Sequence, residues 1–483
     1  FMDNPGRRPI MTANATPERD PMSAYFKDDH TLAACDLAPG LFTGRLPNGM
    51  KVLIRQDSRQ PVAVCNIWVR VGSNREPEKL RGWSHGIEHM LFKGTARRDE
   101  GAFAREVAAA GGTTNAGTGY ETTNYHVTVP AERVDVAVDV LADALFHSSF
   151  APESLEAERQ VLVHENHMYD DIPFGFGLTW RWALELAFDV SPYAHPIGGR
   201  DENLLERSRD EIMAFWRSAY RPDNATVVVV GDVAPAAVAA LVAAAFPVAA
   251  AGGPAAETDP AVAIVADPPV EPPHTSPRCL LETGDIQKAY AKIVLPTPGE
   301  NDPRRHALAV IRRVLGDGRS CRLYRTLIEE RKLADDVSVV AETGPREGVL
   351  VIDLESDAAR MRDAVAAVVE VCAALARDSC TREELGRAAT RVLRGHLFGS
   401  ETVQGQAANL GYHDALGDLG RAFSLPAEIA AVSRPDVAAL ARAIFRTDAL
   451  AAVFYLPEGT DAAAAGIPAD GAGFAALVAP LLP

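Results

Sequence analysis

The sequence predicts an α+β protein with two similar domains, and three observations support this prediction. At 483 residues the chain is too long for a single hydrophobic core. The expected strands and helices follow one another in a similar order in both halves of the chain. Between the halves, residues 251–278 are rich in Ala, Gly and Pro, which is typical of a linker. We therefore expect a polar extension over 1–38, a first domain over 39–250 and a second domain over 279–483.

Alternating and β-branched segments predict the strands of the first half, and amphipathic segments predict its helices. Residues 62–71 alternate so that one face is well buried, and residues 225–230 form an apolar run that ends at a Gly-Asp pair. A Gly-Gly pair closes the helix expected over 100–110. The other expected elements are extended segments on either side of a turn at 46–49, a strand over 122–129, and helices over 84–92, 133–145, 152–169 and part of 201–220.

The second half is expected to repeat this order at low resolution. Each half would then contain one sheet with helices packed against it. The expected elements are strands over 289–295, 348–354 and 451–455, and helices over 303–315, 320–330, 357–376 and 381–397.

Composition excludes several classes of protein. The net charge of −17 argues against nucleic-acid binding, because phosphate contacts need clustered Lys and Arg. An acidic surface favours either solubility or cationic partners. Six scattered cysteines without a C-x-x-C pair indicate reduced, structural thiols. No apolar run is long enough to span a membrane, and the polar start lacks a secretory signal. A cytoplasmic protein is expected, or a periplasmic one if a signal peptide has been removed.

A short run from His85 to His89 is the most informative feature of the chain. Residues four apart on a helix are neighbours, so His85 and His89 can point ring nitrogens at one metal ion. Glu88 lies beside them and can transfer a proton. The order His-x-x-Glu-His is the reverse of the common zinc protease motif, and it is typical of inverzincins.

Two histidines do not complete a zinc shell, so a third ligand must come from elsewhere. The helix expected over 152–169 contains Glu158 and Glu165, which are seven residues apart and share one helical face. One of the two can bind the metal while the other orients a ligand. Two His, one Glu and a fourth position left for water form a catalytic pattern, in which Glu88 would take the proton from that water.

The chain resembles the M16 metallopeptidases, a family that includes pitrilysin, insulin-degrading enzyme and mitochondrial processing peptidase. The resemblance implies one zinc ion per chain, with Glu165 as third ligand and Glu158 as supporting carboxylate. It also implies that Asn115 and Ala116 hold the substrate backbone as an added strand. The length implies the M16B type, in which each chain forms half of a clamshell from two domains with mostly antiparallel sheets. The matching segments are Gly82 to Thr95, Gly111-Gly112, Asn115-Ala116, Thr118, Tyr125, Glu158, Glu165, His195 to Gly198, Tyr220 to Asn224 and Gly231-Asp232.

The second half departs from this family pattern. Members that carry a whole site have an Arg and a Tyr, seven apart, that bind substrate carbonyls. Here Ile328 and Asp335 occupy the corresponding positions. We therefore expect a second M16-like subunit to supply the Arg and Tyr. A self-sufficient homodimer is the alternative, because nearby residues could substitute for the family Arg and Tyr. These residues are Arg322, Tyr324, Arg325 and Arg331.

The predicted function is zinc-dependent hydrolysis of peptide bonds in peptides or unfolded segments that fit an enclosed chamber. Alternatives are a non-catalytic M16-like scaffold subunit and a zinc hydrolase that acts on another bond. His164 and His167 flank Glu165 but are expected to be solvated. Tyr193 and His195 are expected in a loop, where packing and substrate contact are both open.

Overall fold

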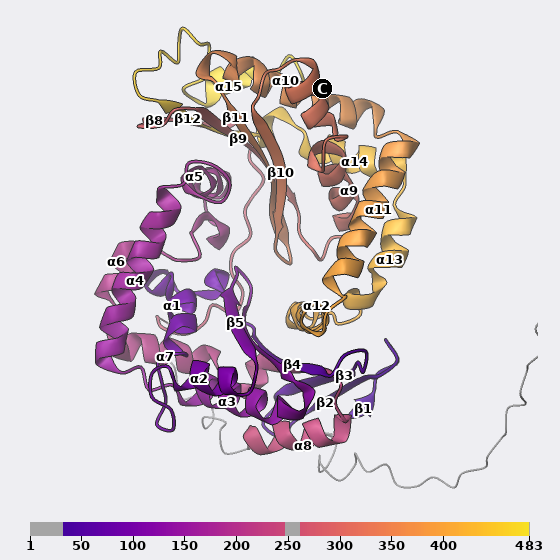
Figure 1. Ribbon diagram of the computed structural model, residues 1–483. Coiled ribbons are helices and arrows are strands. Elements are labelled where there is room, and N and C mark those ends of the chain that lie inside the picture. The colour runs from indigo at the N-terminus through magenta and orange to yellow at the C-terminus, as the bar shows by residue number, and fades with distance from the viewer. Residues whose placement is uncertain (1–31, 247–260, 483) are drawn as a thin grey trace, which may run out of the picture.

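The computed structural model describes residues 32–246 and 261–482 (Figure 1). Most of the predicted extension over 1–38, and residues 251–260 of the predicted linker, lie outside these ranges. The predicted domain boundaries stay a prediction. Within the described residues the chain builds two sheets, and the strands of each come from one half of the sequence.

The first sheet has seven strands in the order β1-β2-β3-β7-β4-β6-β5. Five of its six strand pairings are antiparallel, and β3 with β7 is the parallel one. Strand β5 pairs with β6 alone and therefore forms an edge. The strands are β1 (Ala33–Ala34), β2 (Leu41–Arg45), β3 (Lys51–Gln56), β4 (Val62–Val69), β5 (Thr113–Thr118), β6 (Thr123–Pro130) and β7 (Ala225–Gly231).

The second sheet repeats the topology of the first. Its order β8-β12-β9-β11-β10 matches β3-β7-β4-β6-β5, and its single parallel pair, β8 with β12, corresponds to β3 with β7. The α+β class, the mostly antiparallel sheets and the internal repeat are thus confirmed. The strands are β8 (Arg278–Gly284), β9 (Ala289–Pro298), β10 (Asp336–Thr343), β11 (Glu347–Ser356) and β12 (Ala451–Pro457).

The helices also correspond in order between the halves. The first half contains α1 (Trp83–Met90), α2 (Ala102–Ala109), α3 (Val134–His147), α4 (Pro152–Asp170), α5 (Leu178–Ala187), α6 (Asp201–Glu206), α7 (Arg209–Ala219) and α8 (Pro235–Ala245). The second half contains α9 (Arg305–Gly316), a π-helical segment (Tyr324–Glu330), α10 (Ala358–Asp378), α11 (Arg382–Gly399), α12 (Val403–Ala415), α13 (Arg421–Ala431), α14 (Arg434–Ile444) and α15 (Gly471–Val478). Strands β1, β5, β8 and β10 and helices α5, α8 and α12 to α15 were not predicted.

The central strands of the first sheet are apolar on both faces. In β7, Val227 and Val229 face the core formed with α3 and α8, whereas Val228 and Val230 face the opposite side. A strand buried on both faces needs a cover on each. The cover of the second face is α12, which comes from the second half and packs against β4 and β7 (Figure 1).

The second sheet has the converse arrangement. One face packs against α9, α10 and α14, and the other packs against α5 of the first half. Trp180 and Leu184 of α5 lie in one buried cluster with Val294 of β9 and Val453 of β12. The two halves therefore exchange helices, and each completes the burial of the other's sheet (Figure 1).

Buried ion pairs accompany both exchanged helices. Asp414 of α12 is 2% exposed at its side chain, pairs with Lys51 and Arg70, and accepts a hydrogen bond from the Thr226 hydroxyl at 2.8 Å. On the second sheet, Lys292 of β9 pairs with Asp353 of β11. The same ammonium donates a hydrogen bond to the carbonyl oxygen of Gly175, 2.7 Å away, in the loop between α4 and α5.

All six cysteines lie in the described ranges and are free, as predicted. Among the described helices, none has the length and apolar character needed to cross a membrane. The compartment in which the protein works stays a prediction.

We expect Asp414→Asn to lower the free energy of unfolding by about 3 kcal/mol, because it leaves the buried ends of two cations without their counter-charge. Urea denaturation followed by circular dichroism measures this change. The matched control is Asp363→Asn, which removes an exposed partner of Arg362 and should change stability by less than about 0.5 kcal/mol. Equal stability of the Asp414 variant and the wild type would contradict the proposed role of the ion pair.

Candidate metal and peptide site

Helix α1 is held at its N-terminus by a buried carboxylate. Glu76, which is 3% exposed, accepts hydrogen bonds from the backbone N–H groups of Gly82 at 2.8 Å and Ser84 at 2.5 Å. Burial raises the pKa of Glu76 to about 8. The two backbone donors oppose that shift, and they are groups that a helix leaves without internal partners. Glu76 thus fixes the start of the helix that carries the His-x-x-Glu-His run.

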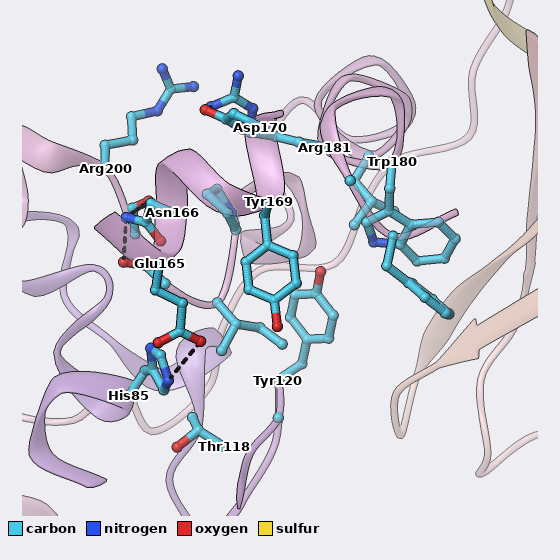
Figure 2. Close-up of a pocket in the computed structure, with 18 of the residues that line it drawn as sticks. His85, Thr118, Tyr120, Glu165, Asn166, Tyr169, Asp170, Trp180, Arg181 and Arg200 are labelled. Atoms are coloured by element: carbon cyan, nitrogen blue, oxygen red, sulfur yellow. Dashed lines mark hydrogen bonds and ion pairs between the residues drawn. The ribbon is translucent and has the colours of Figure 1, made fainter. Parts of the chain in front are cut away.

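Two family-like segments meet at the start of α1. Gly82 has φ +91°, and a Cβ atom there would lie 2.5 Å from the carbonyl oxygen of Gly198. The side-chain amide of Asn166, next to Glu165 on α4, donates to the carbonyl oxygens of Gly198 and Gly199 at 3.3 and 3.4 Å. The glycines therefore allow α1, α4 and the 195–199 loop to approach closely (Figure 2).

The two imidazoles converge on one carboxylate. Nε2 of His85 lies 3.8 Å from Oε1 of Glu165 (Figure 2), and Nε2 of His89 lies 3.7 Å from Oε2 of the same carboxylate. One ligand atom from each residue lies within 4.8 Å of the others. Burial and the neighbouring His89 lower the pKa of His85 to about 4. This imidazole is therefore neutral at physiological pH, as a metal ligand must be.

Glu158 supports the second histidine from behind. It is 5% exposed, and its Oε2 lies 3.0 Å from Nδ1 of His89, while Lys93 pairs with its Oε1 at 2.5 Å. Burial alone would raise the pKa of Glu158, but the hydrogen bonds from Lys93 and His89 lower it. The contact at Nδ1 holds the ring of His89 while its Nε2 faces Glu165.

Glu88 lies on the same helix and is held by the edge strand. The hydroxyl of Thr118, at the end of β5, donates to Oε2 of Glu88 at 2.6 Å. Burial raises the pKa of Glu88, and the Thr118 hydrogen bond opposes the shift. Thr118 is one of the family-like positions in the sequence, but the sequence alone assigns it no contact. In the structure it joins the carboxylate to the strand proposed to bind substrate.

These groups open into one cavity of about 840 Å³, which we call the site cavity. It is lined by His85, Glu88, His89, Glu165, Ala116 to Tyr120 and residues of α4, α5 and the 194–202 segment, together with Glu342. Ala116 lies on edge strand β5, and Asn115 directly precedes it. The backbone N–H of Ala116 donates to the side-chain oxygen of Asn115 at 3.0 Å, so its present partner is a side chain and not another strand.

The flanking histidines and the loop residues lie away from the convergent ligands. His164 is exposed, and His167 is 59% exposed at its side chain and contacts Asp201 at 2.8 Å. Tyr193 is 5% exposed, and its hydroxyl donates to Glu121 at 2.6 Å, which favours the packing alternative. Burial and the nearby Arg81 lower the pKa of His195 to about 4.

The positions aligned with the family Arg and Tyr do not reach the site cavity. Ile328 packs against the core of the second half, and Asp335 pairs with Lys288 at 2.8 Å and Arg360 at 3.0 Å. The four possible substitutes are also absent from the cavity lining. Three of them form ion pairs within the second half, and these are Arg322 with Glu384, Arg325 with Glu330 and Arg331 with Glu370.

A second group of candidate ligands is already occupied by protein contacts. It consists of Asp189, Glu271 and His274. One Glu271 oxygen accepts three backbone N–H groups from 189–191, and the other lies 3.3 Å from His274. Asp189 pairs with Arg278. The group therefore fastens the segment before β8 to the end of α5.

Comparison with known families agrees with this geometry. A family model described as "Insulinase (Peptidase family M16)" matches residues 51–174, which include the histidine run and both glutamates. A second model, described as "Peptidase M16 inactive domain", matches residues 207–392. The two-sheet fold and the site define a protein of the zinc protease class. The chain belongs to peptidase family M16.

The relatives are bacterial and mitochondrial. An uncharacterized zinc protease of Mycobacterium tuberculosis is 29% identical over 384 residues, covering 78% of this chain and 84% of the relative. The uncharacterized zinc protease YmxG of Bacillus subtilis is 26% identical over 404 residues, covering 83% and 95%. A probable mitochondrial-processing peptidase subunit beta of Arabidopsis thaliana is 29% identical over 236 residues, covering 48% and 41%.

Solved structures share the fold. A protease from Helicobacter pylori has a TM-score of 0.79 at 21% identity, covering 87% of this chain and all of that one. A peptidase M16 inactive domain from Pseudomonas fluorescens has a TM-score of 0.77 at 18% identity, covering 86% and 98%. These likenesses establish the architecture of two mixed sheets with helices.

The donor set fits a zinc ion, because it offers two imidazoles and one carboxylate whose ligand atoms converge. We expect the purified chain to bind about one equivalent of zinc by inductively coupled plasma mass spectrometry, and His89→Ala to lose it. His164→Ala, which removes an exposed histidine from α4, should retain the metal. Equal zinc content in the two variants would exclude this ligand assignment.

Proposed function

We propose that the protein is a zinc-dependent endopeptidase of the M16B type in which His85, His89 and Glu165 bind the metal. The observation that carries this proposal is the convergence of three ligand atoms beside Glu88, in a cavity that an edge strand also lines. Zinc, when bound, would acidify a water molecule and polarise the substrate carbonyl. A peptide substrate is favoured over other bonds because an open strand edge recognises extended backbone.

The chain's own residues supply positioning and proton transfer. The edge of β5 at Asn115 and Ala116 would hold the peptide as an added strand. Glu88, oriented by Thr118, would take the proton from water at Oε1 or Oε2 and deliver it to the leaving nitrogen. Glu158 would keep His89 in the orientation that binds metal.

We further propose that the chain works with a second M16-like subunit. The site cavity contains no Arg or Tyr from the second half among the described residues, and one mitochondrial relative is named as a subunit. In the homodimer alternative, one of the substitute arginines would have to leave its present ion pair and reach the site. A scaffold role is disfavoured because all three metal ligands and the base are present.

We expect Glu88→Gln to retain zinc and to lower kcat on a quenched fluorescent peptide at least about 100-fold, because the general base is lost while the ligands stay. Glu153→Gln, an exposed carboxylate at the start of α4, is the control and should keep wild-type turnover. Comparable kcat for the Glu88 variant and the wild type would refute the mechanism.

We expect the isolated chain, loaded with zinc, to cleave peptides slowly, and turnover to rise when a co-purified M16-like chain is added. The reason is that the groups binding the substrate carbonyl would come from that partner. Reconstitution with the Glu88→Gln variant should stay inactive. Full turnover by this chain alone would exclude the two-subunit proposal and support a homodimer.

A further inference from the structure

One wall of the site cavity is built where the two halves meet. Tyr120, at the turn after β5, and Trp180 and Leu184, on exchanged helix α5, form its apolar surface. Figure 2 shows Tyr120 and Trp180 on the side of the cavity away from His85. Glu342 of edge strand β10 also lines the cavity. It is the one lining residue from the second half, among the residues that the structure describes.

Most charges in the cavity wall are already neutralised within the chain. Asp170 pairs with Arg181 at 3.0 Å, and Asp201 contacts His167 at 2.8 Å. The guanidinium of Arg200 pairs with Glu185 at 2.7 Å.

Glu342, in contrast, has no hydrogen-bond or ion-pair partner for its carboxylate in the described part of the chain. Glu202, the other unpaired lining carboxylate, is exposed to solvent.

The surroundings of Glu342 favour a cation. The side chain is half-buried, and burial together with the nearby Glu121 raises its pKa to about 7. Water is partly excluded there, and Glu121 adds a second negative charge, so the ionised form is costly until a positive charge arrives. Tyr120 and Trp180 line the same cavity and offer an apolar surface to the aliphatic stem of a long basic side chain.

We propose that Glu342 is a specificity-determining residue that binds a lysine or arginine side chain of the peptide substrate. This inference rests on the proposed peptidase function and adds its substrate class. Binding pairs the cation with the Glu342 carboxylate, while the peptide backbone lies along β5. The second half thereby contributes to substrate choice although it supplies no metal ligand.

The test uses quenched fluorescent decapeptides that differ at one position, which carries lysine, norleucine or glutamate and is moved along the peptide. For wild type we expect kcat/KM for lysine to exceed that for norleucine at one position at least about tenfold. In Glu342→Gln this ratio should fall at least fivefold, and in Glu342→Lys glutamate should become preferred. Glu282→Gln, an exposed carboxylate on β8, should keep the wild-type ratio.

Two outcomes would overturn the inference. If the lysine preference of the wild type survives in Glu342→Gln, another group must cause that preference. Equal losses for all three peptides in Glu342→Gln, with an unchanged thermal melt, would make the residue a general support of the cavity.

A second measurement separates this inference from the proposed function. The Glu88→Gln variant binds without cleaving, so fluorescence anisotropy with the lysine and norleucine peptides measures affinity alone. Tighter lysine binding that Glu342→Gln abolishes would support the inference even if no hydrolysis occurs. Hydrolysis without any lysine preference in binding or turnover would leave the peptidase standing and reject the role of Glu342.

Discussion

The structure depends on one physical constraint, which is that both sheets have central strands that are apolar on two faces. Strand β7 illustrates it, because all seven of its residues are buried. Each half of the chain provides helices for only one face of its own sheet. The other face of the first sheet is covered by α12, and the other face of the second sheet is covered by α5. Neither half can bury its sheet alone, so the two halves are expected to be stable only together.

This exchange also positions the site. Helix α4 carries Glu158 and Glu165, and the loop after it leads directly into α5. Lys292 of the second half donates a hydrogen bond to the carbonyl oxygen of Gly175 in that loop, which ties the connection between α4 and α5 to the second sheet. The same packing brings β10, with Glu342, to the cavity that β5 lines. The second half thus affects the site by positioning α5 and Glu342, although it contributes no proposed metal ligand.

The local parts of the site could be predicted from the sequence. The spacing of His85 and His89, and of Glu158 and Glu165, is fixed by the helix repeat, and the structure brings the proposed ligands together. Strand β5 was missed because its sequence, TTNAGT, is polar and lacks alternation. Helices α5 and α12 were missed because their covering role depends on partners more than a hundred residues away.

The other features that the sequence does not predict depend on contacts between residues far apart in the chain. Nothing in the sequence around Glu342 separates it from the exposed carboxylates of neighbouring strands, because its position depends on how the two sheets meet. The π-helical segment Tyr324–Glu330 replaces a helix expected over 320–330, and it directs Ile328 into the core. Patterns with periods of two or 3.6 residues do not predict such a segment.

The open edge of β5 has a cost that the cavity offsets. An unpaired strand edge is a template on which other copies of a protein can add strands, and this is a common route to aggregation. Here α1, α4 and α5 line the same recess as Ala116 and its neighbours. An extended segment needs less room beside that edge than the sheet edge of another folded molecule does. The recess is therefore expected to disfavour self-association through the strand edge that is proposed to bind substrates.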